Sequence, residues 1–518
     1  MYTIQALSAG IALLAATLLL RRLFQRRSVV SRLPVAPAEE ASILWGHEYR
    51  VTKGEASAEY TRWAGLLGQV FRIKAALFQR DRVIVADNLV AQHIFQNAYT
   101  YLKSPAFEPV VVKIVGRGIV WAEGEEHKFQ RRLLVPAFTL SAVNGMADDV
   151  LQCAEKCASR LASELQEDIS EGVFNLSLYI PACALETICR VGFGRDFGYE
   201  NSDIQAILGS WRKDVQKYAT FPAFLAPRLI GMFPWIARLP IEAFQEDGFA
   251  KKAIQRVAAE LLKQPSNPDG RDIFSILVRE SWEGKANPGV KLSNQQLIDN
   301  ITTLLMAGFE TSSGVVMFTL LDLAHNMEAQ TKLREELLAA ELDWKTIENL
   351  PYLDAVTRES LRLHPSASDT HRVAICDDTI PLRRPVTLQT GETITALPVR
   401  AGDEFTIPYT LLNTNTATWG LNAQEFVPER WMTSDGVPPS NDLPRGPWSN
   451  VSTFADGPRV CIGWRLGVMQ VKMLLAVMVR KFEFKDSGVK IDKMLSPSLQ
   501  PFVAGEAATL PIHISLAH

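Results

Sequence analysis

The first residues of the chain form a long apolar run that ends at a cluster of arginines. Residues 1–20 carry no charged side chain, and the residues that follow directly include Arg21, Arg22, Arg26 and Arg27. About 20 residues at roughly 1.5 Å each are long enough to cross a bilayer core. A cleaved signal peptide would carry positive charge before the apolar run, whereas here the charge follows it. The pattern therefore predicts a transmembrane signal anchor over residues 1–32, with residues 33–518 on the cytosolic side.

Beyond the anchor, the spacing of apolar positions predicts a mainly α domain with small β-sheets. Residues 141–216 follow a helical period throughout, whereas prolines and glycines make residues 103–120 more like a loop. Alternating patterns predict two strands over residues 70–74 and 82–86, and a second strand-rich region over residues 382–408. No polar linker divides the chain, so we expect a single large domain despite its length of 518 residues.

Residues 221–236 differ from the rest because they are apolar and interrupted by prolines. They are too interrupted to span a membrane and too hydrophobic for an ordinary loop. Such a segment is typical of a membrane or partner contact. Burial under neighbouring helices explains the pattern equally well.

A stretch near the C-terminus, with the sequence FADGPRVCIG over residues 454–463, combines one cysteine with residues that shape a tight turn. Gly457 and Gly463 lack a Cβ and allow sharp bends close to a flat cofactor. Arg459 offers a planar set of donors for a carboxylate. Apolar residues at helical spacing follow, so Cys461 is expected just before a helix whose dipole favours a thiolate. A lone cysteine is usually a small buried hydrophobe, but the fixed spacing favours a metal ligand.

A second region of interest is a long apolar helix that a capping-box pattern, Ser293 with Gln296, is expected to open. Gly308 inside it costs about 1 kcal/mol relative to alanine, which indicates close packing against a flat ring. Glu310 and Thr311 place an acid beside a hydroxyl, a combination suited to passing protons. A kinked core helix without a catalytic role would produce the same pattern.

Composition and charge narrow the classes of function. Apolar residues make up 47% of the chain and charged residues 21%, as in a globular protein with a large core. The net charge of −3 gives no indication of a nucleic-acid partner. The six cysteines include no C-x-x-C pair, which argues against a disulfide framework and for a reducing compartment. Cys153 and Cys157 are expected to be core neighbours.

The motifs occur in the order found in the cytochrome P450 family, which the chain resembles from about residue 33 to its C-terminus. They are the cysteine turn, the Ala-Gly-x-Glu-Thr helix, a helix with Glu359-x-x-Arg362, and the later Pro-Glu-Arg-Trp segment that contains Arg430. The chain is most similar to membrane-anchored fungal members. The resemblance implies a cytochrome P450 fold in a single catalytic domain behind the anchor, a haem b cofactor and a monooxygenase reaction.

The resemblance also implies roles for individual residues. Cys461 would be the proximal ligand of the iron, and Thr311 with Glu310 would relay protons. Other cofactor-binding residues are expected to be Phe454, Gly463 and Gly308. The haem propionates would be held by Arg131, Arg372, Arg459 and His127, the last of which stands where the family has a tryptophan. A buried trio that holds the cysteine loop without a catalytic role would consist of Glu359, Arg362 and Arg430.

The sequence also predicts a partner that supplies electrons and a contact with a membrane. We find no glycine-rich dinucleotide fingerprint, so electrons are expected from NADPH through a separate NADPH-cytochrome reductase. It would dock on a basic patch formed by Arg131, Arg132, Arg465 and Lys472. The resemblance and the anchor together predict a single-pass protein of the endoplasmic reticulum membrane, in contact with lipid and facing the cytosol.

The substrate is expected to be lipophilic, such as a terpenoid or other secondary metabolite. The predicted cavity walls are residues 110–120 and 221–235, Met306, residues 366–370 and Phe502. One alternative is a haem-thiolate isomerase or dehydratase that needs no external electrons. Another is a membrane haem-binding protein without turnover. The Glu310–Thr311 pair and the lack of an output domain count against these.

Overall fold

The computed structural model describes residues 28–105, 107–168, 171–233, 235–236, 239, 247–263, 270–282 and 292–517. Residues 1–27 of the predicted anchor lie outside this part of the chain. Two segments of the described chain are long and apolar enough to cross a membrane, namely Leu176–Phe193 and Asn294–His325. In the most apolar 18-residue stretch of each segment, 83% and 78% of the residues are buried inside the protein, as expected for core helices.

Helices form most of the described chain. Their bounds are α2 Glu48–Lys53, α3 Ala58–Leu67, α4 Asn88–Gln96, α5 Glu108–Val115, α6 Gly124–Leu134, α7 Leu140–Asn144, α8 Ala147–Asp168, α9 Ile180–Phe193, α10 Ser202–Tyr218, α11 Phe221–Met232, α13 Phe249–Leu261, α14 Ile273–Trp282, α15 Asn294–His325, α16 Met327–Leu338, α17 Trp344–Ile347, α18 Pro351–Leu363, α19 Tyr409–Thr414, α20 Thr416–Trp419 and α21 Trp464–Lys481.

The strands are short. Their bounds are β1 Val70–Ile73, β2 Arg82–Val85, β3 Tyr101–Lys103, β4 Glu171–Asn175, β5 Asp369–Ala374, β6 Asp378–Thr387, β7 Thr393–Val399, β8 Glu404–Pro408, β9 Phe482–Asp486, β10 Asp492–Leu495, β11 Leu499–Val503, β12 Glu506–Ala507 and β13 Pro511–Leu516. Within the described residues the largest sheet has the order β1-β2-β8-β5-β3, in which only β2 and β8 run parallel.

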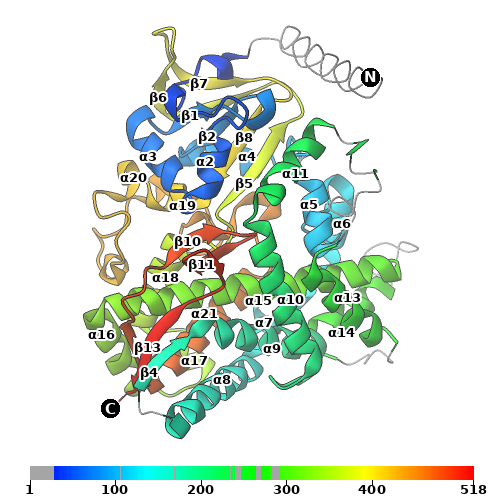
Figure 1. Cartoon of the computed structure of the whole chain (residues 1–518), viewed down its shortest axis with the longest axis vertical. Helices are drawn as coiled ribbons and strands as arrows, with labels where there is room; N and C mark the ends of the chain where they lie inside the picture. Colours follow the sequence, from blue (N-terminus) through cyan, green and yellow to red (C-terminus); the bar gives the residue numbers. More distant parts are fainter. Residues whose placement is uncertain are drawn as a thin grey trace, which may run out of the picture.

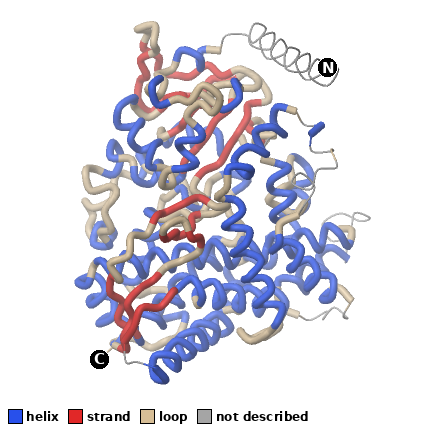
Figure 2. The backbone as a smooth tube through the Cα atoms, viewed as in Figure 1, coloured by secondary structure: helices blue, strands red, loops and turns tan. Residues whose placement is uncertain are grey.

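The large sheet and the β6–β7 hairpin lie at one end of the molecule, and the helices gather at the other end (Figure 1). Figure 2 shows the same division, with a second group of strands beside the C-terminus. The long helix α15 crosses the helical part and packs against α9, α13, α18 and α21. Its capping box is present as predicted, because Ser293 and Gln296 bond each other's backbone N–H groups.

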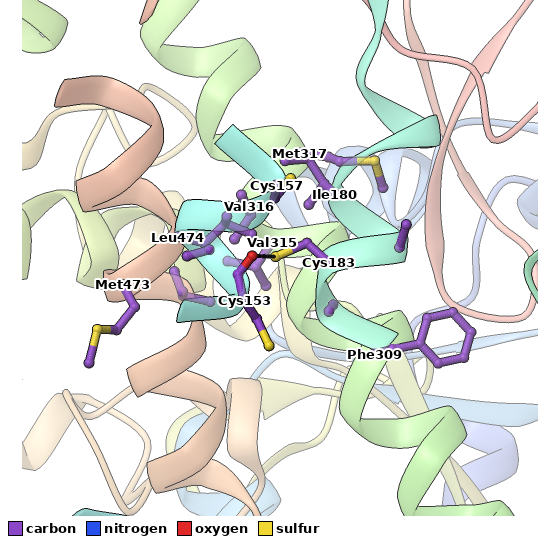
Figure 3. Packing of buried hydrophobic residues seen from close by; sticks show 14 of the residues in the cluster. Cys153, Cys157, Ile180, Cys183, Phe309, Val315, Val316, Met317, Met473 and Leu474 are labelled. Carbon is purple, nitrogen blue, oxygen red and sulfur yellow. Dashed lines mark hydrogen bonds between the residues drawn. The ribbon is translucent and has the colours of Figure 1, made fainter. Parts of the chain in front are cut away.

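The core between α8, α9, α15 and α21 is shown in Figure 3. Cys153, Cys157 and Cys183 lie there among apolar side chains, and the Cys183 thiol donates to the carbonyl of Cys153 at 3.5 Å. In the part of the chain that the structure describes, no group of three or more metal-ligating side chains is present. Because Cys153 and Cys157 are both buried in the same apolar core, the prediction that they are core neighbours is confirmed.

Two predictions about local structure need correction. Residues 103–120 contain helix α5, because Pro109 fits the first helical turn and the positive φ of Gly116 ends the helix. The supposedly continuous helical region 141–216 is interrupted by β4, which pairs with β13 from the distant C-terminus. Residues 221–232 form helix α11 despite Pro227 inside it. The strands predicted over 70–74 and 82–86 are confirmed as β1 and β2.

Candidate active site

The cysteine turn is held by its own backbone. Cys461 donates its backbone N–H to the carbonyl of Phe454 at 2.9 Å, which closes the loop between them. Gly457 has a φ of +69°, and a Cβ there would lie 2.3 Å from the carbonyl oxygen of Phe95. A side chain at this position would therefore push the turn away from α4. Helix α21 begins at Trp464, so Cys461 lies just before a helix N-terminus, as predicted.

Cys461 opens into a cavity of about 410 Å³. Helix α15 forms one wall through Ala307, Gly308 and Thr311, and the cysteine turn and the start of α21 form another. Although the Cys461 side chain is exposed to the cavity, the surrounding protein atoms desolvate its thiol. This burial raises the pKa of the Cys461 thiol, while the N–H of Gly463 and the charge of Arg131 act in the opposite direction.

Cationic side chains gather along one side of this cavity. This cationic group consists of Lys103, Arg131, Arg372 and Arg459, and the neutral His127 lines the same cavity. Arg131 donates to the carbonyl of Val460 at 2.8 Å, and Arg459 donates to the carbonyl of Ala122 at 3.0 Å. Both arginines are thus fixed against the backbone of the loops that form the cavity.

Two nitrogens in this cationic group lack hydrogen-bond partners. The Nη1 atom of Arg372 and the Nε atom of Arg459 are buried, and neither donates a hydrogen bond to any group in the described chain. Burial, with Arg459 as a further cause, lowers the pKa of Lys103 to about 7 and that of His127 to about 3. Glu123 forms ion pairs with both Lys103 and Arg459 and offsets part of their charge. The orphaned donors and the remaining positive charge fit a pair of carboxylates, such as haem propionates. The residues present therefore fit the implied haem.

Lys103 was missed by the sequence-based prediction. It lies on β3, opposite Arg372 in the antiparallel register of β3 with β5. Its Nζ donates to the carbonyls of Trp121 and Ala122 at 3.3 and 3.1 Å. No local motif marks Lys103, because only the pairing of β3 and β5 brings it beside Arg372.

The glycine of α15 has a neighbour that its sequence context did not indicate. A Cβ on Gly308 would lie 2.6 Å from Cδ1 of Ile188 on α9. Close packing of two helices, rather than a flat ring alone, therefore explains the missing side chain. Thr311 donates its hydroxyl to the carbonyl of Ala307 at 2.6 Å, and Ser366 donates to the carbonyl of Thr311 at 2.7 Å.

The two residues of the predicted proton relay face different surroundings. Thr311 lines the cavity, whereas Glu310 is not among its lining residues. Ser498 beside β11 donates to the Glu310 carboxylate at 2.8 Å, and Gln500 donates to Ser498 at 2.7 Å. Burial raises the pKa of Glu310 to about 7. In this structure only Thr311 therefore faces the cavity, while the Glu310 carboxylate is bound by Ser498.

The predicted ionic trio is assembled in the interior. Arg362 donates to both oxygens of Glu359, at 2.8 and 2.9 Å, and Arg430 donates to Glu359 at 3.1 Å. Arg362 also donates to the carbonyl of Asn413 at 3.0 Å. The Asn413 side chain accepts from the N–H of Ser452 at 2.7 Å. The trio is thus connected to the segment that precedes the cysteine turn.

Some of the predicted cavity walls are confirmed. The lining includes Ile119, Val120, Ser366, Ala367, Asp369 and Thr370. Met306, Phe502 and helix α11 contribute no lining residue, so these parts of the prediction are wrong. Met306 and Phe502 are buried in the core. On α11, Phe221 and Phe224 pack edge-on against Trp45 and Tyr49.

The predicted basic patch is also smaller than expected. Lys472 is only 3% exposed, and its Nζ contacts Asp354 at 2.6 Å and the carbonyl of Glu348 at 2.8 Å. A buried and neutralised lysine does not form part of a docking surface. Arg132 is exposed, and Arg465 is partly exposed.

The chain is similar to known proteins along most of its length. The model of the cytochrome P450 family matches residues 37–506. The cytochrome P450 monooxygenase claO of Ampulloclitocybe clavipes is 30% identical, and the alignment covers 93% of each chain. The monooxygenase claW of the same organism is also 30% identical, over 96% of this chain and 95% of the relative. Cytochrome P450 monooxygenase 205 of Postia placenta is 27% identical, over 85% and 84%.

Proposed function

We propose that this chain, which belongs to the cytochrome P450 family, oxidises a lipophilic molecule such as a terpenoid with electrons from an NADPH-cytochrome reductase. It is a haem-thiolate monooxygenase that acts on a small molecule, and a redox partner supplies its electrons. The apolar cavity lining supports the proposed substrate class, with residues such as Phe107, Ile119, Ile188 and Leu304.

We assign the proximal thiolate to Cys461 and the contacts with the propionates of a haem b to the cationic group. Arg131 and Arg459 are held by backbone carbonyls, and the unpartnered nitrogens of Arg372 and Arg459 are available to carboxylates. Lys103 joins them in this role. Because His127 is neutral near pH 7, it would contribute a hydrogen bond rather than a charge. When bound, the haem supplies the activation of dioxygen, which a thiolate ligand favours.

On the opposite wall, we propose that Thr311 positions protons with its hydroxyl, which now donates to the carbonyl of Ala307. Glu310 is the proton reservoir behind it, since its pKa of about 7 allows it to hold or release a proton at neutral pH. Its carboxylate would have to leave Ser498 to reach the cavity. The trio of Glu359, Arg362 and Arg430 holds the loop that precedes the cysteine turn, and it takes no part in the reaction.

For the location in the cell, we propose an anchor over residues 1–32 and a catalytic domain over residues 33–518 that faces the cytosol at the endoplasmic reticulum membrane. The charge-free run followed by arginines supports this orientation. Exposed apolar side chains of the described domain, such as Ile43, Leu44 and Trp235, support a contact between this domain and lipid.

The observation that carries the proposed function is one cavity that joins the Cys461 thiol, the cationic group and Thr311. The test is turnover of the purified protein with NADPH, a reductase and a panel of lipophilic compounds under ¹⁸O₂. The expected product contains one labelled oxygen atom and forms only with the reductase. A rearranged product that forms without reductase or NADPH would instead support an isomerase.

A further inference from the structure

A second cavity of about 400 Å³ lies on the other side of helix α21 from the candidate active site. On α21 its wall is formed by Trp464, Arg465, Val468 and Lys472. The α21 residues that line the first cavity are Leu466, Gly467, Gln470 and Val471. Among the residues that the structure describes, the two cavities share no lining residue, and α21 separates them.

Three indole rings line this second cavity, which is an unusual concentration of aromatic surface. Trp344 comes from α17, Trp448 from the loop before the cysteine turn, and Trp464 from the first turn of α21. The Nε1 atom of Trp344 is fixed by a 3.2 Å hydrogen bond to Asn144. Rigid aromatic faces of this kind bind flat apolar rings.

The charged groups of the cavity leave one cation without an acidic partner. Asp354 accepts from Arg358 at 2.5 Å and from Lys472 at 2.6 Å, so a single carboxylate serves two cations. Arg465 stacks on Trp464 with its guanidinium carbon 4.3 Å from the ring centroid. In the described part of the chain, no carboxylate lies within ion-pair distance of Arg465. With Glu348 included, three cations face two carboxylates, which leaves the wall positively charged.

From this arrangement we infer a second binding site for a flat aromatic molecule that carries one carboxylate or sulfonate group. The ring occupies the space between the indoles, and the anion pairs with Arg465, whose planar donors match a carboxylate. The ligand is a free small molecule. It contacts Trp464, three residues after Cys461, and leaves the substrate cavity open.

The test is calorimetric titration of the full haem-loaded protein with 2-naphthoate, and with 2-naphthalenemethanol as the uncharged analogue. We expect 2-naphthoate to bind about tenfold more tightly than the alcohol, because only the carboxylate pairs with Arg465. Arg465→Gln should remove this preference, and Trp344→Leu should weaken both probes. Arg132→Gln, which changes an exposed arginine outside the cavity, should bind like the parent protein.

The position of the haem absorbance band separates the second site from the first. Binding at the inferred site leaves intact the spectral change that a substrate-cavity ligand causes. The inference is overturned if 2-naphthoate competes with such a ligand, if neither probe binds at millimolar concentration, or if Arg465→Gln binds 2-naphthoate as tightly as the parent. Far-ultraviolet circular dichroism confirms that each variant is folded.

Discussion

Arg362 holds the carboxylate of Glu359 through two hydrogen bonds of 2.8 and 2.9 Å, and solvent reaches neither side chain. A buried pair of this kind costs free energy when only one partner is removed, because the other charge stays behind without compensation. Arg362 is also connected through Asn413 to Ser452, so loss of the pair should disturb the cysteine turn as well.

We therefore expect Arg362→Met to destabilise the protein by about 3–5 kcal/mol and to abolish stable haem incorporation. Urea unfolding and the haem-to-protein ratio measure the two effects. Arg358→Met is a matched control on the same helix, because its partner Asp354 retains a contact with Lys472. Equal haem content in Arg362→Met and Arg358→Met would contradict the structural role of the trio.

We expect the cationic group to slow the dissociation of haem. Arg372→Leu removes a buried donor whose Nη1 has no protein partner. Since a charge-assisted hydrogen bond contributes roughly 1.5–3 kcal/mol, haem should dissociate about 10- to 100-fold more readily. Transfer of haem to apomyoglobin measures this. Arg384→Leu, at an exposed position on β6, is the control. Identical transfer rates would exclude Arg372 from the site.

Because the pKa of Glu310 is raised in the folded protein, we expect the free energy of unfolding to depend on pH. Its pKa is raised from 4.5 to about 7 in the folded protein, so the folded state holds a proton that the unfolded state releases. The stabilisation is complete below pH 4.5 and is lost as the pH rises through about 7. Relative to Glu310→Gln, the parent should lose roughly 3 kcal/mol between pH 5 and about pH 8. Urea midpoints at both pH values measure this, and a constant difference would refute it.

A double-mutant cycle tests the helix contact at Gly308. Gly308→Ala places a methyl group 2.6 Å from Ile188 Cδ1 inside a packed core, which should cost about 1–3 kcal/mol. In the background of Ile188→Ala, the same substitution should be neutral or stabilising, since alanine favours the helix by about 1 kcal/mol. Thermal unfolding of the four proteins gives the coupling. If the two costs simply add, Ile188 is not the reason for the glycine.

The sequence located the cysteine turn, the α15 motif and the ionic trio because each has a local pattern. A tight turn, a helix face and an i, i+3 pair depend on neighbouring residues, and the pattern records them directly. The strands β1 and β2 were likewise predicted from alternation. These features account for the position of Cys461 and for the fixed residues around it.

What the sequence did not reveal depends on contacts between distant segments. Lys103 reaches the active site through the pairing of β3 with β5, and Ile188 meets Gly308 through the packing of α9 on α15. The orientation of the Glu310 carboxylate depends on its hydrogen bond with Ser498, which lies 188 positions away in the sequence. Likewise, Lys472 looks like a surface charge until Asp354 is placed beside it. Residue type and spacing alone do not record these pairings.

The central claim is that the sulfur of Cys461 binds the haem iron. The most direct measurement is the absorbance spectrum of the reduced, haem-loaded protein after addition of carbon monoxide. We expect the parent protein to show a Soret band at the long wavelength given by a thiolate-ligated haem, and Cys461→His to lose that band. A parent spectrum without the long-wavelength band, or an unchanged spectrum in Cys461→His, would contradict it.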